Sequence, residues 1–573
     1  AYALRHKGFV AFTAFILMVV AGIDLLYPQL TRYAINVFVT PGRTEGIWAF
    51  AAVYALAVIV QGACVFLFVY GASHLEMHIA YDIRQEAFAK LQQLSFSFFD
   101  TTSVGWLMAR MVSDVTRLSD MIAWSLVDLM WAGMFIIGII VVLLSMHWQL
   151  GLLVLVVVPF LAMACLFFQK RILQEQRVVR KTNSRITGAF NEGIMGAITT
   201  KTLVREEKSA EEFQDLTGVM RKASIRAAIL SAIFMPIVMM LGSVSTALAL
   251  SAGGNLVLKG MLDLGTLAAF LTYTTQLFDP VQQLARILAE MQSAQASAER
   301  VLDLLDTQPD VCDTAAVVAQ YGDAFAPKRE NWPAVHGGVE FCDVGFVYKN
   351  GERVLEHFNL TVKPGESIAL VGETGAGKST LVNLVCRFYE PSEGAVRIDG
   401  VDYRERSQLW LHSALGYVLQ SPHLFSGSIA DNIRYARKDA TMQEVREAAQ
   451  MVHAAAFIEA LPDGYDTEVG EGGDRLSTGQ KQLVSFARVI LANPRIFVLD
   501  EATSSIDTET EQQIQNAIGA VLQGRTSFIV AHRLSTIRSA DRILVMQNGK
   551  IAECGTHAEL MAKKGYYYTL TQQ

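Results

Sequence analysis

Long apolar runs, separated by polar segments, dominate the first half of the chain. Six of these runs approach the roughly 20 residues that an α-helix needs to cross a bilayer. The last of them is the least apolar, because Asp279, Pro280 and Arg286 fall in its second half. The pattern predicts six membrane-spanning helices. They cover about residues 8–28, 46–72, 122–146, 148–169, 227–252 and 262–288.

The connections between the runs differ in charge. The long connection between the fourth and fifth runs is rich in Lys and Arg, whereas the short connections offer only Arg32, Arg43 and Lys259. Positively charged loops stay on the cytoplasmic side of a membrane. Both long connections and both chain ends are therefore predicted to be cytoplasmic. Segments 74–94 and 170–190 keep helical periodicity, so we expect two helical hairpins that project from the membrane.

Two kinds of residue inside the runs leave alternatives open. Asp24 and Asp128 lie in or at the edge of apolar runs, where an unpaired charge is costly. Each either lines a substrate cavity or sits at a helix-packing or interfacial position, and the sequence favours neither. Met235, Met239 and Met240 offer an adaptable substrate surface, although their spacing is more typical of lipid-facing or packing residues.

The pattern changes in the second half of the chain. Residues 290–305 predict a polar amphipathic helix, and 306–336 predict a linker that contains three prolines. A strand pattern begins at Val339. We therefore predict a transmembrane domain over 1–305, a linker over 306–336 and a cytoplasmic domain over 337–573.

Composition narrows the functional classes. The chain has 573 residues, of which 52% are hydrophobic and 18% charged, too apolar for an ordinary soluble protein. The formal net charge of −7 argues against a nucleic-acid-binding protein, which would carry a basic stripe. The six cysteines are scattered without a CxxC pair, which indicates neither a disulfide framework nor a zinc site.

Residues 372–379, Gly-Glu-Thr-Gly-Ala-Gly-Lys-Ser, match the phosphate-binding loop pattern. An apolar run before the loop predicts a buried strand, and the amphipathic segment after it predicts a helix. The glycines let the backbone turn N–H groups toward an anion, and the helix start adds its positive dipole end. We expect Lys378 to reach the β- and γ-phosphates and Ser379 to bind Mg²⁺. The predicted nucleotide-binding residues of this segment are Gly372, Glu373, Thr374, Gly375, Ala376, Gly377, Lys378, Ser379 and Thr380.

Two further elements suit ATP hydrolysis. Residues 495–501 predict an apolar strand that ends in Asp500 and Glu501. Asp500 is expected to hold Mg²⁺ through water, and Glu501 to polarise the attacking water. Residues 476–480 open a predicted helix and supply a second anion site. One domain needs only one anion site for the phosphates of its own ATP. The second anion site is therefore expected to serve an ATP bound to another copy.

This set of motifs resembles that of ATP-binding cassette (ABC) transporters, and six spans with one C-terminal cassette resemble a bacterial exporter half-transporter. The resemblance covers essentially the whole chain. It implies an α-helical six-span transmembrane domain plus an α/β P-loop NTPase cassette with a helical subdomain. It also implies short coupling helices near residues 101–106 and 200–206 that dock on the cassettes.

The resemblance assigns further roles within the cassette. It implies that Tyr348 stacks on adenine and that Gln420 senses Mg²⁺ and the membrane domain. Asp507 matches the D-loop, and His532 matches the histidine that contacts the γ-phosphate. Residues 476–480 match the signature motif. The implied catalytic residues are Glu501, His532, Gln420 and Asp507, the metal-binding residues are Ser379, Gln420 and Asp500, and the nucleotide contacts also include Ser477, Gly479 and Gln480.

The sequence departs from the family pattern at three places. Thr478 stands where the signature motif usually has glycine, the D-loop reads Ser-Ser-Ile-Asp over 504–507, and Leu419 replaces a common proline. In heterodimeric bacterial exporters, the subunit with an intact catalytic glutamate often carries an altered signature. The chain suits that role, and it equally suits a homodimer that tolerates the altered signature.

We therefore expect a dimeric exporter of the bacterial cytoplasmic (inner) membrane. It uses ATP and Mg²⁺ to move a small amphipathic, drug-like or lipid-like substrate outward by alternating access. Its expected partners are a second half-transporter, the lipid bilayer and the substrate, with no nucleic acid. A lipid or peptide flippase or exporter of the same architecture is the alternative.

Other classes fit less well. A soluble ABC ATPase acting on nucleic acid or ribosomes would lack the spans. An ATP-gated channel or receptor regulator tends to carry extra domains. An importer is disfavoured because spans and cassette are fused, and a peptide exporter with its own protease domain is disfavoured because nothing precedes the first span.

Overall fold

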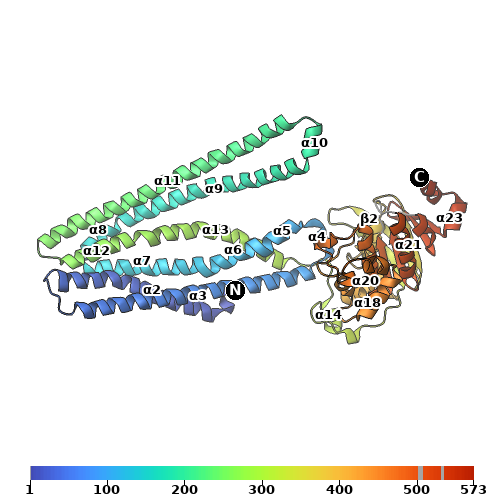
Figure 1. Ribbon diagram of the computed structural model, residues 1–573, viewed down its shortest axis with the longest axis horizontal. Helices are drawn as coiled ribbons and strands as arrows, with labels where there is room; N and C mark the ends of the chain where they lie inside the picture. Colours follow the sequence, from blue (N-terminus) through green and yellow to red (C-terminus); the bar gives the residue numbers. More distant parts are fainter. Residues whose placement is uncertain (1, 501–507, 531–533, 573) are drawn as a thin grey trace. The chain divides into compact units, whose positions relative to one another are not determined.

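The computed structural model describes residues 2–500, 508–530 and 534–572, which form two compact units (Figure 1). The N-terminal unit comprises residues 1–92 and 103–307, and the C-terminal unit comprises 93–102 and 308–573. Residues 93–102 therefore group with the C-terminal unit, although they lie far upstream in the sequence. The predicted domain and linker bounds, with breaks at 305 and 336, stay predictions.

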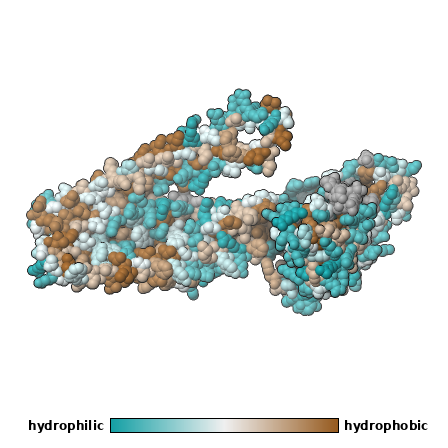
Figure 2. Space-filling model, in the orientation of Figure 1, coloured by the Kyte–Doolittle hydropathy of each residue, from teal (hydrophilic) through white to brown (hydrophobic). Residues whose placement is uncertain are grey.

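The N-terminal unit is entirely helical in its described residues. Its longest helices turn apolar side chains outward: the most apolar stretch of the helix over 47–93 is only 6% buried. Such a surface suits a lipid environment, and Figure 2 shows apolar side chains along these helices. The helices are α1 (Tyr2–Arg5), α2 (Lys7–Ala34), α3 (Ile47–Gln93), α5 (Val104–Met108), α6 (Val115–Asp120), α7 (Leu126–Met146), α8 (Trp148–Leu155), α9 (Val157–Met195), α10 (Ala197–Thr202), α11 (Glu206–Leu258), α12 (Leu264–Gln276) and α13 (Phe278–Asp306), with π-helical turns η1 (Ile35–Val39), η2 (Ala109–Asp114) and η3 (Met121–Ser125).

Within the described residues, five helical stretches are long and apolar enough to cross a membrane. The predicted count of six is not confirmed. The sixth predicted run is divided at Leu277 between α12 and α13, and the polar residues of α13 lower its hydropathy. The five stretches are Lys7–Val39, Ile47–Gln93, Val104–Met146, Trp148–Met195 and Glu206–Leu258.

The second predicted hairpin is present. Helices α9 and α11 run side by side, and α10 crosses the tip between them (Figure 1). At 53 residues, α11 extends about 80 Å, well beyond the thickness of a bilayer.

The structure shows the surroundings of Asp24 and of the three methionines, whose roles the sequence left open. Gln61 Nε2 on α3 donates to Asp24 Oδ1 on α2 at 2.6 Å, so Asp24 joins two neighbouring helices. Met235, Met239 and Met240 are exposed on α11, which favours their interpretation as lipid-facing residues.

Two β-sheets build the C-terminal unit. The six-stranded sheet has the order β10-β9-β3-β8-β7-β6, and all neighbours except β10 and β9 are parallel. Strands β3 and β8 are fully buried, as expected for a parallel sheet covered on both faces. The four-stranded antiparallel sheet has the order β2-β1-β4-β5. The strands are β1 (Val339–Val347), β2 (Arg353–Val362), β3 (Ser367–Val371), β4 (Glu393–Ile398), β5 (Val401–Asp402), β6 (Leu415–Val418), β7 (Ile496–Asp500), β8 (Thr526–Val530), β9 (Arg542–Gln547) and β10 (Lys550–Gly555).

Helices surround these sheets, and a group of them forms the predicted helical subdomain. Helices α17 and α18 pack against α20, and apolar side chains such as Ile433, Val445 and Leu483 join one core with the sheet residues Leu499 and Ile529. The helices of the unit are α4 (Phe96–Thr101), α14 (Ala315–Tyr321), α15 (Lys378–Val385), α16 (Gln408–Ser413), α17 (Ile429–Arg434), α18 (Met442–Met451), α19 (Ala455–Glu459), α20 (Thr478–Ala492), α21 (Thr508–Leu522), α22 (Leu534–Arg538), α23 (His557–Lys563) and α24 (Tyr566–Gln572), with single 3₁₀ turns η4 (Arg329–Asn331), η5 (Tyr403–Glu405), η6 (Gly464–Asp466) and η7 (Glu471–Gly473).

Short helix α4 is the part of the first long connection that packs in the C-terminal unit. The Phe96 ring stacks on Phe388 with centroids 4.0 Å apart, and Tyr389 Oη donates to Asp100 Oδ2. The segment near 101–106, predicted as a coupling helix, contains the end of α4 and the start of α5, and the segment near 200–206 begins in α10. Docking of these segments on the cassettes stays a prediction.

A buried arginine ties the segment before β1 to the sheet region. Arg387 is 1% exposed, and its guanidinium donates to Asp313 Oδ1 at 2.8 Å and to Glu390 Oε1 at 2.9 Å. The same group donates to the carbonyls of Tyr403 and Arg406. Each carboxylate thus has a partner in a region of low water content, which makes the arginine costly to remove.

We expect Arg387→Met to destabilise the C-terminal unit by about 3–5 kcal/mol, because it leaves Asp313 without its cation. The exposed Arg397 on β4 provides a matched control, and Arg397→Met should change stability by less than about 0.5 kcal/mol. Thermal unfolding of the purified full chain measures both. Equal unfolding temperatures for the two variants would contradict the structural role of Arg387.

Candidate functional site

The phosphate-binding loop lies at the carboxyl end of β3, directly before α15, as the sequence predicts. Gly372 and Gly377 have φ angles of +152° and +97°, which L side chains rarely adopt. A Cβ on Gly372 would also approach the Met546 carbonyl oxygen to 2.3 Å. Glycine is therefore required at both positions for the loop to curl in front of the helix.

Lys378 opens α15 and reaches back over the loop. It is 8% exposed, and its Nζ donates to the carbonyl oxygens of Gly372 at 2.6 Å and Glu373 at 2.8 Å. Burial lowers the pKa of Lys378, and the negative charge of Asp500 opposes that effect. A phosphate in the loop would act in the same direction as Asp500 and would stabilise the charged amine.

Loops from several strands meet the phosphate-binding loop. Parallel pairing sets Val418 of β6 beside Leu499 of β7, and Asp500 beside Val530 of β8. The carboxyl ends of these strands therefore share one edge of the sheet, where ligands bind in such folds.

A cavity of about 270 Å³ lies at this edge. Of the residues predicted from the sequence, the structure brings together on its wall Tyr348, Thr374, Gly375, Gly377, Lys378, Ser379, Thr380, Gln420 and Asp500.

The sequence analysis missed three residues of this wall: Glu352, Val354 and Val530. Glu352 and Val354 arrive through the antiparallel hairpin of β1 and β2, whose register is not evident from local patterns. Val530 ends β8, and the apolar run before His532 in the sequence was its only signal.

Other predicted residues lie around the loop without lining the cavity. Gly372 and Ala376 shape the backbone, and the Glu373 carboxylate accepts a hydrogen bond from Tyr566 Oη at 2.7 Å. Glu373 therefore contributes to the loop through its main chain and anchors α24 through its side chain.

Tyr348 is an aromatic residue in the wall of the cavity. Its hydroxyl lies 2.9 Å from Thr380 Oγ1, and its ring meets Phe346 and Tyr389 edge-on. These contacts hold the ring in place, and a fixed aromatic surface beside a phosphate loop suits the stacking of a base.

The predicted second anion site does not line this cavity. Ser477 caps α20: its Oγ accepts from Gln480 N–H at 3.2 Å, and Gln480 Oε1 accepts from Ser477 N–H at 2.9 Å. Ser477 and Thr478 are exposed, whereas Gly479 is buried. The helix start is therefore formed and accessible.

Three predicted catalytic residues, Glu501, Asp507 and His532, lie outside the described residues. Their predicted roles are therefore untested. The described strands β7 and β8 end at Asp500 and Val530, one and two residues before Glu501 and His532.

Comparisons with known proteins cover both units. The family model described as "ABC transporter transmembrane region" matches residues 10–281, and the model described as "ABC transporter" matches 355–504. A fatty acid ABC transporter ATP-binding/permease protein of Mycobacterium tuberculosis is 38% identical over 86% of this chain and 75% of its own. An ATP-dependent lipid A-core flippase of Desulfotalea psychrophila is 36% identical over 85% and 83%.

A solved structure resembles the whole chain. A bacterial Atm1-family ABC exporter with ATP bound superimposes with a TM-score of 0.80 and 28% sequence identity. The match covers 99% of this chain and 98% of the exporter.

Lys378→Ala should weaken ATP binding by about tenfold to a hundredfold, since it removes charge-assisted contacts to phosphate. The exposed Lys363 is the matched control, and Lys363→Ala should bind ATP like the unaltered chain. Equilibrium binding of a fluorescent ATP analogue distinguishes them. An unchanged dissociation constant for Lys378→Ala would remove the lysine from the site.

Proposed function

Because this chain belongs to the ABC transporter family, as an exporter with membrane region and ATPase cassette in one chain, we propose a specific working cycle for it. The chain is a multi-pass membrane protein with a cytoplasmic cassette, and ATP hydrolysis drives its transport. The observation that carries the proposal is the single cavity shared by Tyr348, Lys378, Ser379, Gln420 and Asp500.

In this proposal, ATP lies along the cavity with adenine on Tyr348 and its phosphates in the loop. Lys378 and the N–H groups at the start of α15 bind the phosphate oxygens. Ser379, Gln420 and Asp500 offer oxygen ligands beside them, the donor type that Mg²⁺ prefers. When bound, Mg²⁺ would neutralise charge that develops on the phosphates.

Hydrolysis is assigned to residues that follow the described strands. Glu501 orients and polarises the attacking water, His532 contacts the γ-phosphate, and Asp507 contributes through the D-loop. The support is positional: Glu501 and His532 follow the ends of β7 and β8, at the sheet edge where the cavity lies.

The half-transporter architecture implies a dimer, and we assign the partner to a second copy of this chain. One chain carries both halves of a complete site: the cavity at β3 and the capped start of α20 with Ser477, Gly479 and Gln480. Because these halves do not share a cavity within the chain, each serves an ATP across the dimer interface. The exposed Thr478 leaves that helix start accessible.

Closure of the cassettes on ATP then drives alternating access of a six-span membrane domain, with α12 and the start of α13 as the sixth span. Helix α4 transmits the movement through Phe96 and Asp100, and α10 is the second coupling helix. ATP favours the closed state because it binds that state better.

Lipid-like amphiphiles are the proposed substrates. The relatives named for fatty acid transport and lipid A-core flipping support this class. A relative of Bacillus subtilis that is named a putative multidrug export ATP-binding/permease protein, 34% identical, supports drug-like molecules as the second candidate.

Glu501→Gln should keep ATP binding and reduce turnover at least about a hundredfold, because the amide is a poor base. Glu471→Gln, at an exposed residue of the same unit, is the matched control and should hydrolyse ATP normally. Phosphate release in proteoliposomes measures turnover. Undiminished hydrolysis by Glu501→Gln would contradict the assigned role.

A further inference from the structure

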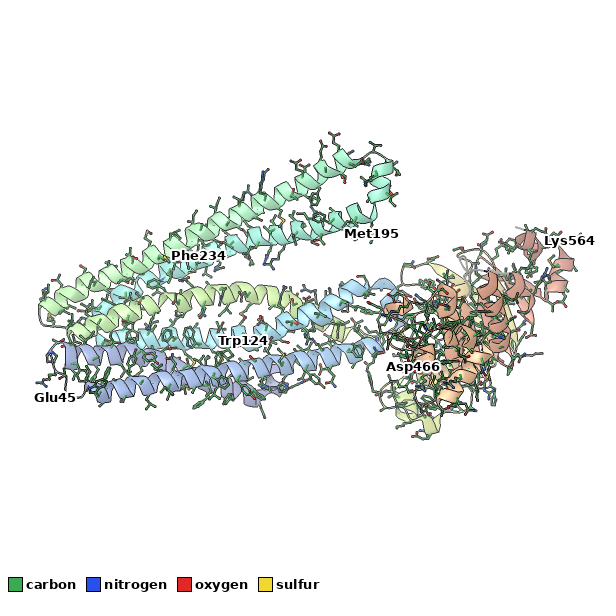
Figure 3. The ribbon with its side chains drawn as sticks, in the orientation of Figure 1. Glu45, Trp124, Met195, Phe234, Asp466 and Lys564 are labelled. Atoms are coloured by element: carbon green, nitrogen blue, oxygen red, sulfur yellow. The ribbon has the colours of Figure 1, made fainter. Side chains whose placement is uncertain are left out.

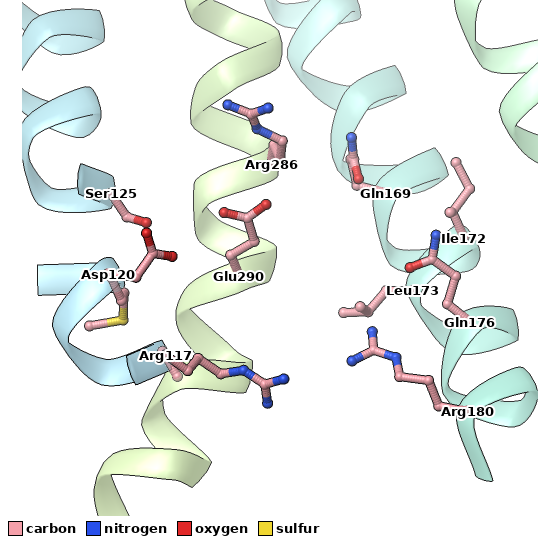
Figure 4. A pocket seen from close by; sticks show the side chains of 12 residues that line it. Arg117, Asp120, Ser125, Gln169, Ile172, Leu173, Gln176, Arg180, Arg286 and Glu290 are labelled. Carbon is pink, nitrogen blue, oxygen red and sulfur yellow. The ribbon is translucent and has the colours of Figure 1, made fainter. Parts of the chain in front are cut away.

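The phosphate-binding loop carries a carboxylate of its own, that of Glu373. Figure 4 shows, by contrast, a cavity of the N-terminal unit in which the acidic Glu290 shares the wall with Arg117 and Arg286. The setting of Glu373 differs, because its loop is shaped to hold the negative charge of phosphates. A Glu373 carboxylate that turned toward bound ATP would repel those phosphates.

A tyrosine holds the Glu373 carboxylate. Tyr566 Oη on α24 donates to Glu373 Oε1 at 2.7 Å, although the two residues are 193 positions apart in the sequence. This hydrogen bond raises the pKa of Tyr566 above its usual value, so the phenol keeps its proton at neutral pH and remains a donor. Glu373 does not belong to the described wall of the nucleotide cavity. Its carboxylate is therefore bound to α24 and not turned to the space proposed for ATP.

The main chain of Glu373 supports the residues that bind phosphate. Its carbonyl oxygen accepts from Lys378 Nζ at 2.8 Å and from the Ala376 N–H at 3.2 Å. Glu373 thus contacts the phosphate-binding lysine through its backbone and α24 through its side chain. The placement of this side chain bears directly on the part of the loop that ATP would contact.

Helix α24 holds Tyr566 in a fixed position. Glu553 on β10 accepts from the N–H groups of Tyr566 and Tyr567, at 2.6 and 3.0 Å. The Tyr567 side chain is fully buried, and its hydroxyl lies 2.8 Å from His557 Nδ1 on α23. Lys564, labelled in Figure 3, caps the end of α23 two residues before α24 begins. The Tyr566 hydroxyl is therefore held in place by contacts that do not depend on the loop.

We propose that Tyr566 is a positioning residue for ATP: by binding the Glu373 carboxylate, it keeps this negative charge away from the phosphates. The inference rests on the proposed function, because it requires ATP in the loop. Release of the carboxylate would oppose the bound phosphates in the ground state and in the transition state alike. Loss of the Tyr566 hydroxyl should therefore raise KM for ATP and leave kcat nearly unchanged.

The test begins with Tyr566→Phe, which removes the hydroxyl and keeps the ring. In the full chain in proteoliposomes, KM for ATP should rise about threefold to tenfold, and kcat should stay within about twofold. Tyr568→Phe is the matched control and should leave KM unchanged. Tyr568 lies on the same helix, and within the described part of the chain its hydroxyl makes no hydrogen bond. Phosphate release over a range of ATP concentrations gives both constants.

A second background separates the charge of Glu373 from the packing of α24. Glu373→Gln removes the negative charge and keeps the shape of the side chain. The double variant Tyr566→Phe/Glu373→Gln should have the same KM for ATP as Glu373→Gln alone, because no carboxylate is left to repel the phosphates.

An unchanged KM for Tyr566→Phe would overturn the proposal. A rise in KM of equal size in the Glu373→Gln background would also overturn it, because that result would assign the effect to the packing of α24. Failure of both the unaltered chain and Tyr568→Phe to hydrolyse ATP would instead contradict the proposed function, and the role of Tyr566 with it.

Discussion

The alignment of parallel strand ends in the C-terminal unit is the constraint on which the rest of the structure depends. Pairing of β3, β8, β7 and β6 places the phosphate-binding loop, Val530, Asp500 and Gln420 at one edge. Lys378 is buried there against its own loop carbonyls, and among the described residues those carbonyls and the charge of Asp500 stabilise its charge. A phosphate is the group that best completes this arrangement.

Within the same unit, side-chain contacts connect the nucleotide cavity to α4. Tyr348 at the cavity contacts the Tyr389 ring, and Tyr389 donates to Asp100 on α4. Lys349, which follows Tyr348 in sequence, forms an ion pair with Asp310 at 2.7 Å, and Asp310 accepts a hydrogen bond from Ser97 on α4. Tyr348, which lines the cavity, and Lys349, which follows it in sequence, are thus each connected to α4 through one intermediate residue, Tyr389 and Asp310 respectively.

Structural features that depend on neighbouring residues in the sequence were predictable, whereas those that depend on distant residues were not. The apolar run before residue 372 and the helix after 377 are confirmed as β3 and α15, because hydrophobic pattern and glycine spacing act over a few residues. The packing of α4 could not be predicted, since Phe96 stacks on Phe388, nearly 300 residues away in sequence. Glu352 and Val354 were missed for the same reason, because strand register is a long-range property.

The central claim is that each ATP lies between two copies, with Lys378 from one and Ser477 from the other. Mixed dimers test it most directly: one tagged chain carries Lys378→Ala, the other carries Ser477→Arg, and both carry Glu501→Gln. If the site is shared, the doubly tagged dimer retains one intact pair and occludes about one ATP. Dimers of either variant alone should occlude none. A doubly tagged dimer that occludes no ATP would contradict the account, because it would place both residues in a site within one chain.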